Sequence, residues 1–178
     1  MKIYKTLRQW SSRKTAFVIG ASIFCLCTSA TMLFVVNFSG DWKLNESKSE
    51  VGQFGRGAAR SIKVVSSDAN GIVIERTSTN RDGEAVVRKE SLTFDGKEIE
   101  TTGGFGNSKR KMKAKWSADG NSMIIDAVTV VDRDGQTMEI KQSETWKLSA
   151  DGNTLTIEST SSFGGNDNTQ KLVYEKGK

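Results

Sequence analysis

From residue 37 onward, short runs of alternating apolar and polar residues are separated by turns that contain glycine. Such alternation buries one face of a β-strand, and Asn-Gly or Asp-Gly pairs supply the positive φ angles that tight hairpin turns need. Six of these pairs separate the runs: Asn70-Gly71, Asp82-Gly83, Asp95-Gly96, Asp119-Gly120, Asp134-Gly135 and Asp151-Gly152. The pattern predicts a series of antiparallel hairpins.

The turns delimit about ten strands. Their expected ranges are 38–45, 60–67, 71–79, 84–94, 97–102, 108–117, 121–131, 136–148, 153–163 and 168–176. A glycine-rich loop with a short helical turn at its start is expected over 46–59. Short strands joined in order favour an up-and-down meander, and closing it into a barrel removes the unpaired edges. The predicted fold class is therefore all-β, an antiparallel meander closed into a barrel.

Successive turns of a meander lie at alternate ends of the barrel. The first, third, fifth, seventh and ninth connections include the loops that hold Phe54, Phe105 and Phe163, and we call their end the loose end. The other connections include two identical Ser-Ala-Asp-Gly-Asn turns, at 117–121 and 149–153, and we call their end the tight end. The three Phe residues are predicted to form the mouth.

Side-chain parity separates the inside of the barrel from the outside, because residues two apart on a strand share a face. Bulky apolar residues fall inside near the tight end. Polar inward-facing residues fall from the middle of the barrel toward the loose end. The predicted lining of a ligand cavity is Arg76, Arg88, Glu90, Gln142, Glu144 and Ser159.

The N-terminus has the composition of a targeting segment. Five basic residues precede an apolar run from Ala16 to Val36, and no acidic residue occurs before Ala30. This run matches either a signal peptide cleaved after Ala30 or an uncleaved membrane anchor. Both alternatives export the remainder of the chain. The predicted organisation is a leader over 1–36 and a barrel domain over 37–178.

The remaining composition excludes several kinds of chemistry. The chain has no histidine, and its two cysteines, Cys25 and Cys27, lie in the leader. His-based and Cys-based catalysis and the commonest zinc sites are therefore excluded, and no metal or cofactor is expected. Without its first 30 residues the chain has 21 basic and 21 acidic residues, so nucleic acid is not an expected partner.

One strand carries a row of lysines on its outer face: Lys109, Lys111, Lys113 and Lys115. A charged outer wall that discourages edge pairing is the first interpretation. Contact with anionic lipid headgroups is the alternative.

Three phrases resemble those of lipocalin-like (calycin) barrels, in particular secreted bacterial domains of unassigned function. They are Phe38-Ser39-Gly40-Asp41-Trp42-Lys43-Leu44-Asn45, the run from Glu144 to Gly152, and the run from Thr169 to Tyr174. The resemblance implies that Trp42 plugs the closed end, with an arginine near the end of the chain packed over it, and this chain departs from that pattern. Here only Lys171, Lys176 and Lys178 are available. Parity places Trp116 and Trp146 beside Trp42 in this plug.

Three functional hypotheses follow. The first is an extracytoplasmic barrel that binds a small apolar or amphipathic molecule and is not an enzyme. The second is a membrane-tethered structural or protein-interaction module with a filled core. The third is a carboxylate-dependent enzyme, which requires that Glu90 and Glu144 approach each other without an intervening arginine.

Overall fold

The computed structural model describes residues 36–51, 58–80, 82–102, 108–133 and 135–177. These residues all belong to one compact unit that spans Leu33–Lys178. Residues 1–35 of the leader, the helix expected there, and the loop segments 52–57 and 103–107 that hold Phe54 and Phe105 lie outside the described residues.

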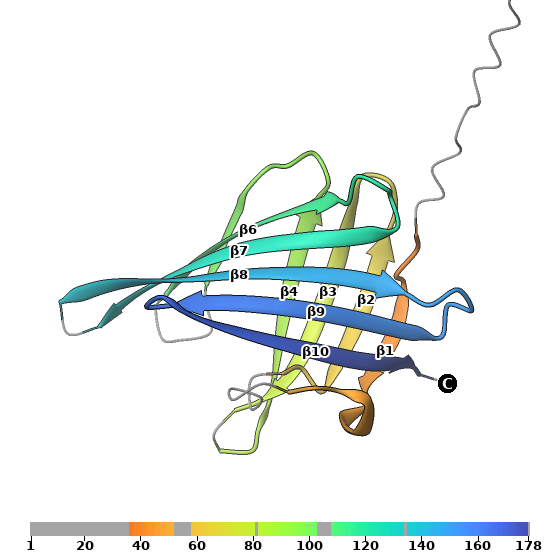
Figure 1. Ribbon diagram of the computed structural model, residues 1–178, viewed down its shortest axis with the longest axis horizontal. Coiled ribbons are helices and arrows are strands. Elements are labelled where there is room, and N and C mark those ends of the chain that lie inside the picture. The colour runs from red at the N-terminus through yellow and green to blue at the C-terminus, as the bar shows by residue number, and fades with distance from the viewer. Residues whose placement is uncertain (1–35, 52–57, 81, 103–107, 134, 178) are drawn as a thin grey trace, which may run out of the picture. The chain divides into compact units, whose positions relative to one another are not determined.

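Ten antiparallel strands make up the described part of the chain (Figure 1). Their bounds are β1 Gly40–Leu44, β2 Ser61–Ser67, β3 Gly71–Thr79, β4 Ala85–Thr93, β5 Ile99–Thr102, β6 Lys109–Trp116, β7 Ser122–Arg133, β8 Gln136–Leu148, β9 Thr154–Phe163 and β10 Asn166–Lys176. Each strand begins and ends close to its predicted range. The all-β meander is confirmed.

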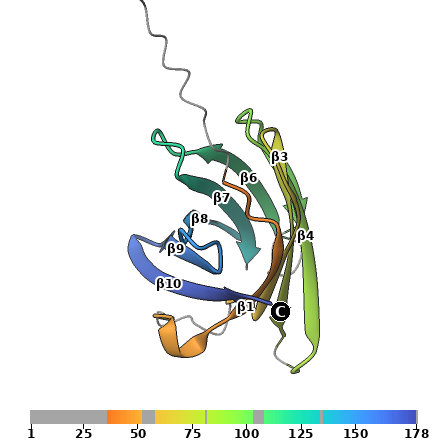
Figure 2. The ribbon, with the colours of Figure 1, turned by 90° about the vertical axis from the view of Figure 1, so that its right-hand side faces the viewer.

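The strands form one sheet in the order β4-β3-β2-β1-β10-β9-β8-β7-β6-β5. The first and last strands pair with each other, with Trp42 opposite Lys176 and Leu44 opposite Tyr174. The sheet curls so that β4 lies beside β6, which makes the barrel nearly closed. Figure 2 shows β3 and β4 on one side and β7 to β10 on the other.

The seam of the barrel lies between β4 and β5, where the sequence predicts a hairpin. Within the described residues β4 pairs only with β3, and β5 only with β6. The Asp95 carboxylate accepts hydrogen bonds from Thr93 Oγ1 at 2.5 Å and from Lys97 N at 3.1 Å. This local turn occupies the Lys97 amide, and β5 then follows β6 away from β4.

The two Ser-Ala-Asp-Gly-Asn turns have the same internal hydrogen bonds. Ser117 Oγ and Ser149 Oγ each donate to the turn's aspartate at 2.5 Å. The asparagine amides donate back to the same aspartates at 3.2 Å and 3.1 Å. Each turn therefore holds its hairpin in a fixed register at the tight end.

Aromatic side chains fill the tight end. Trp42 and Trp146 are fully buried, and Trp116 is half-buried. Phe38, which the sequence analysis did not assign to the plug, stacks on Trp116 with ring centroids 6.0 Å apart and meets Trp146 edge-on at 5.9 Å. Its carbonyl oxygen also accepts a hydrogen bond of 2.9 Å from Trp42 Nε1. Phe38 thus joins the three tryptophans into one plug.

Lys176 covers the plug from the end of the chain. Its ammonium group lies 5.5 Å from the centre of the Trp42 ring, close enough for a cation–π interaction. The resemblance implies an arginine in this place, and here a lysine, Lys176, lies over Trp42 instead.

The only helical element in the described segments is a short 3₁₀ turn, η1 (Glu46–Lys48). Asn45 caps it, because Asn45 Oδ1 accepts a hydrogen bond of 3.1 Å from Lys48 N. The short helical turn expected at the start of the first loop is therefore present. No helix in the described ranges has the length and apolar character needed to cross a bilayer.

The outer wall of β6 carries the predicted lysine row. Lys111 pairs with Glu98 at 3.1 Å, Lys115 with Asp126 at 3.5 Å, and Lys109 with Glu100 at 3.8 Å. Acidic residues of the neighbouring segments thus offset much of this charge, which favours the solvent-facing wall over a lipid-binding patch.

Candidate functional site

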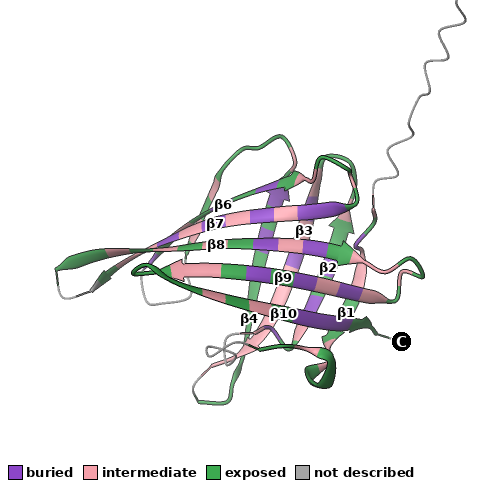
Figure 3. Cartoon of the chain, viewed as in Figure 1, coloured by how far each residue is buried: buried purple, intermediate pink, exposed green. Residues whose placement is uncertain are grey.

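On β3, β4, β8 and β9 the inside of the barrel changes from buried to accessible at one level, whereas Thr129 on β7 and Ser108 before β6 stay buried beyond it. Inward-facing residues are buried up to Ile74 on β3, Glu90 on β4, Glu144 on β8 and Ser159 on β9. The next inward positions toward the loose end are half-buried or exposed: Arg76, Arg88, Gln142 and Ser161. Figure 3 shows the same change along β8 and β9. We call the accessible inward face beyond this level the cup.

Arg76 lies at this level and joins two buried carboxylates. Its Nη2 donates to Glu144 Oε2 at 2.7 Å, and its Nε donates to Glu90 Oε2 at 3.2 Å. The guanidinium carbon lies 5.2 Å from the centre of the Trp146 ring. Trp146 Nε1 donates to Glu144 Oε2 at 2.9 Å. A single arginine therefore connects β3, β4 and β8 on top of the aromatic plug.

Polar side chains extend this cluster across the barrel. Gln142 Nε2 donates to Glu144 Oε1 at 3.1 Å and lies 3.3 Å from Ser159 Oγ. Gln142 Oε1 accepts a hydrogen bond of 3.1 Å from Arg110 Nη2 on β6. The floor of the cup is thus a continuous polar layer, made by Arg76, Glu90, Arg110, Gln142, Glu144 and Ser159.

The electrostatics of the floor hold Glu144 in its charged form. Burial opposes the ionisation of Glu144, but the charge of Arg76 and the hydrogen bonds from Trp146 and Arg76 outweigh it, so the pKa of Glu144 is below its ordinary value. Burial also tends to lower the pKa of Arg76, but Glu144 and Glu90 raise it well above its ordinary value. Both groups are charged at neutral pH.

This arrangement does not match a carboxylate acid–base pair. A general acid among paired carboxylates needs a raised pKa. Here Arg76 lies between Glu90 and Glu144 and lowers the pKa of Glu144. The enzyme hypothesis required that no arginine lie between Glu90 and Glu144, and Arg76 lies between them.

Five of the six predicted cavity residues meet in the floor. The sixth, Arg88, lies opposite Arg76 in the β3–β4 ladder and is exposed in the cup. Its positive charge is near enough to contribute to lowering the pKa of Arg110. Of the predicted mouth residues, Phe163 ends β9 and is 47% exposed. Phe54 and Phe105 lie outside the described residues.

Sequence reasoning missed Arg110. It shares a face with the buried Met112 and Ala114, so parity places it inside the barrel. The four neighbouring lysines on β6 were interpreted as an outer wall, so Arg110 was not assigned to the inward face.

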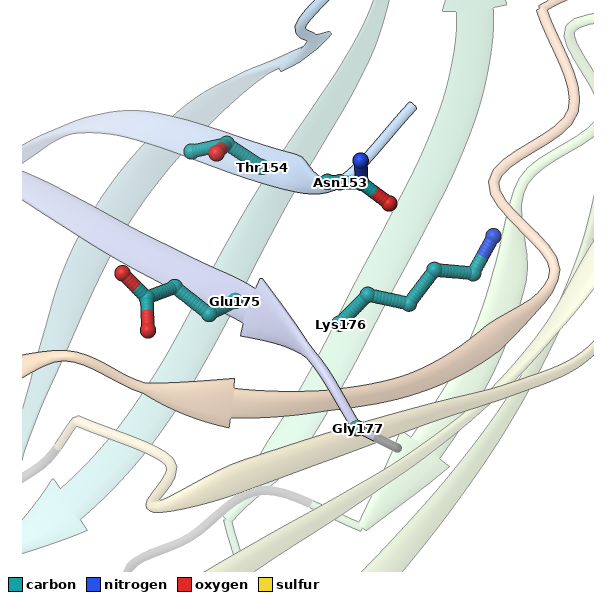
Figure 4. Close-up of a pocket in the computed structure, with 5 residues that line it drawn as sticks. All are labelled: Asn153, Thr154, Glu175, Lys176 and Gly177. Atoms are coloured by element: carbon teal, nitrogen blue, oxygen red, sulfur yellow. The ribbon is translucent and has the colours of Figure 1, made fainter. Parts of the chain in front are cut away.

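Two pockets formed by described residues lie away from the floor. One, of about 400 Å³, is lined by Asn153, Thr154, Glu175, Lys176 and Gly177 (Figure 4). Its charged residues are already engaged, since Glu175 pairs with Lys48 at 2.9 Å and Lys176 covers Trp42. The other, of about 360 Å³, lies at the turn that follows β4. Within the described ranges no three acidic or Cys side chains gather as metal ligands.

Comparisons with known proteins give little beyond this geometry. No family model matches the chain, and no curated protein matches it significantly. Among solved structures, the chain is similar to zebrafish ileal bile acid-binding protein, solved in complex with cholic acid. The two share 16% sequence identity with a TM-score of 0.49, over 79% of this chain and 98% of that chain. So distant a similarity says nothing about function, and the fold assignment stands on the strand pairing itself.

Removing Arg76 should destabilise the protein strongly. In Arg76→Gln the two buried carboxylates lose their shared partner, which costs about 3–5 kcal/mol of unfolding free energy at neutral pH. Urea unfolding of the full chain measures this. Arg60→Gln is the matched control: its pair with Glu46 is exposed, so the loss should be below about 1 kcal/mol. Equal losses in the two variants would contradict a structural role for the Arg76 ion pairs.

Stability should also fall in acid through Glu144. A carboxylate with a lowered folded-state pKa stabilises the fold above its unfolded pKa of about 4.3, and this contribution is lost as the pH falls through the folded value. In Glu144→Gln the decrease of unfolding free energy below that pH should be shallower than in the parent chain. Urea unfolding at a series of pH values checks this, and an unchanged slope would contradict it.

Proposed function

We propose that this protein binds a small amphipathic molecule in the cup. The observation that supports this most is the common level at which four strands pass from buried to accessible inward positions. A barrel filled by its own side chains would continue its buried layers toward both ends. Here the buried layers of β3, β4, β8 and β9 stop at a charged floor, and beyond it Thr129 on β7 and Ser108 remain buried.

The walls of the cup suit an amphipathic molecule, which has an apolar body and a polar end. Val86, Met138 and Ile140 are inward-facing apolar residues that remain partly or fully accessible above the floor. Apolar walls with a few converging polar groups are typical of small-molecule sites. An apolar body against these walls would bring a polar group to Gln142 and its neighbours.

We also propose that the domain works outside the cytoplasm. The basic residues before Ala16 and the uncharged run that follows are typical of an export signal. In a bacterial host, the domain should be digested by protease added to intact spheroplasts. Protection until the cells are lysed would count against export.

A protein-interaction module is the second candidate. It is favoured by apolar residues exposed on two different strands, where Val87 on β4 is 60% exposed and Phe163 on β9 is 47% exposed. Exposed apolar groups can serve as docking sites for a protein partner. On this reading the cup binds no small molecule.

Filling the cup should abolish binding of a small probe. Ser161 faces inward on β9 and Thr160 faces outward beside it. Ser161→Trp should weaken binding of the fluorescent amphiphile 1-anilinonaphthalene-8-sulfonate by about tenfold or more, since the indole occupies the space above the floor. Thr160→Trp should leave the affinity as in the parent. Fluorescence titration of the full chain measures both.

Two results would contradict the binding proposal. Equal weakening by both substitutions would place the probe on the outer wall or the leader. A parent chain that does not bind the probe and carries no small molecule in native mass spectrometry would favour the interaction module.

A further inference from the structure

The first half of β4 is a strand edge that is exposed in the described part of the chain. Among the described residues β4 pairs only with β3. Residues 85–89 of β4 are all exposed, although successive side chains of a strand point to opposite faces of the sheet. Buried residues begin only at Glu90. Residues 85–89 are therefore accessible on both faces, and one of their edges has no described strand paired with it.

Neither β5 nor β6 pairs with this edge within the described residues. β5 pairs with β6 rather than with β4. β4 and β6 meet near their C-terminal ends, where Phe94 packs on Trp116 with ring centroids 5.0 Å apart. From this contact the two strands diverge toward their N-terminal ends (Figure 1). Figure 2 shows β4 at the outer side of the barrel. The first half of β4 is thus presented to other molecules.

The backbone of this edge directs its hydrogen-bonding groups into the seam at the odd-numbered positions. At one end of the β3–β4 ladder, Asn80 N donates to Glu84 O at 2.9 Å, and at the other end Phe94 N donates to Asn70 O at 2.9 Å. The register does not shift between these ends, and an antiparallel ladder alternates at every second residue, so the even-numbered residues of β4 bond to β3. The amide and carbonyl groups of the odd-numbered residues point the other way. Such a row of groups is a template for pairing with another strand.

Val87 lies at the centre of the exposed run and gives it an apolar character. It is 60% exposed, against 36% for Val86 beside it. Charged side chains usually protect an edge strand from pairing, and on the outer face of this run the charged residue is Lys89. Lys89 Nζ lies 3.4 Å from Glu75 Oε1 on β3, so its charge is offset within the same barrel. The protection of this edge against pairing is therefore weak.

We infer that two copies of this chain associate by antiparallel pairing of β4 with β4, with Val87 of one copy opposite Val87 of the other. A two-fold axis at this point pairs both exposed edges at once. Odd-numbered positions of the two copies then face each other, so the groups that point into the seam form the new ladder. The inference does not depend on binding of a small molecule in the cup.

The register of this pair follows from the length and the charges of the exposed run. Centring on Val87 aligns all five exposed residues, 85–89, of one copy with the same five of the other. Lys89 then faces Ala85, and Arg88 faces Val86. Centring on Arg88 would place the two Arg88 side chains opposite each other, and like charges in that position are destabilising. Centring on Val86 would pair only three strand residues of each copy with one another, because β4 begins at Ala85.

The first test compares two lysine substitutions by sedimentation velocity of the full chain. One strand pair is a small interface of the transient class, so the parent should form dimers at about 100 µM protein. Val87→Lys places two positive charges opposite each other and should weaken the dimer about fivefold or more. Val65→Lys is the matched control, because Val65 is 48% exposed on β2, away from the seam. It should leave the dimer unchanged.

The second test detects the register by disulfide formation in a chain that also carries Cys25→Ser and Cys27→Ser. In Val87→Cys the Cα atoms of the two new cysteines lie about 5.5 Å apart, a separation that a disulfide spans. In Lys89→Cys the two cysteines are four residues apart along the ladder, roughly 14 Å. Both positions are exposed, yet Val87→Cys should give several-fold more cross-linked dimer than Lys89→Cys under mild oxidation.

Each other outcome overturns the inference. A parent chain that stays monomeric at the stated concentration does not pair through β4. A dimer that persists in Val87→Lys uses another surface, such as the leader. Equal cross-linking of the two cysteine variants excludes a pair centred on Val87. The cysteine variants decide the question even if Val87→Lys fails to fold, which circular dichroism would show.

Discussion

The ion pairs of Arg76 with Glu144 and Glu90 divide the interior of this barrel into two parts. Toward the tight end, aromatic and aliphatic side chains pack without access to solvent. Toward the loose end, the inward-facing positions of β3, β4, β8 and β9 are accessible. A buried ion pair is stabilising only when its remaining hydrogen-bonding capacity is satisfied. Trp146 and Gln142 meet this condition for Glu144, so the charged layer depends on the plug beneath it.

The same interaction also holds the barrel together where the sheet does not. Strands β4 and β5 do not pair within the described residues, so no backbone ladder closes the seam between them. Arg76 links β3 and β4 to β8 on the opposite wall. At the tight end, Phe94 packs on Trp116 with ring centroids 5.0 Å apart and ties the end of β4 to the end of β6. Side chains replace the missing ladder at two levels.

The sequence was enough to predict the strands, their facing and most of the floor, because period-two alternation and glycine turns act locally. It could not predict the seam, since Asp95-Gly96 has the same dipeptide as turns that do form hairpins. Side-chain parity places both Arg76 and Arg88 inside the barrel, so either arginine was expected to pair with Glu90 and Glu144. Only Arg76 forms ion pairs with both, whereas Arg88, which faces Arg76 in the β3–β4 ladder, is exposed. A choice between two facing arginines depends on how side chains pack across the closed barrel, which a single strand does not encode.

The depth of the polar floor within the barrel is set by the two identical Ser-Ala-Asp-Gly-Asn turns. Both Arg110 and Gln142 lie seven residues before the first serine of a Ser-Ala-Asp-Gly-Asn turn, at Ser117 and Ser149. Since the two turns have the same hydrogen bonds and the two hairpins the same register, each side chain lies at the same distance from its own turn. Across β7 the two are offset by one inward position, because Ala127 pairs with both Met112 and Gln142. Both face inward on strands separated only by β7, and they meet at 3.1 Å. The turns thus fix the level at which the packed core ends and the polar floor begins.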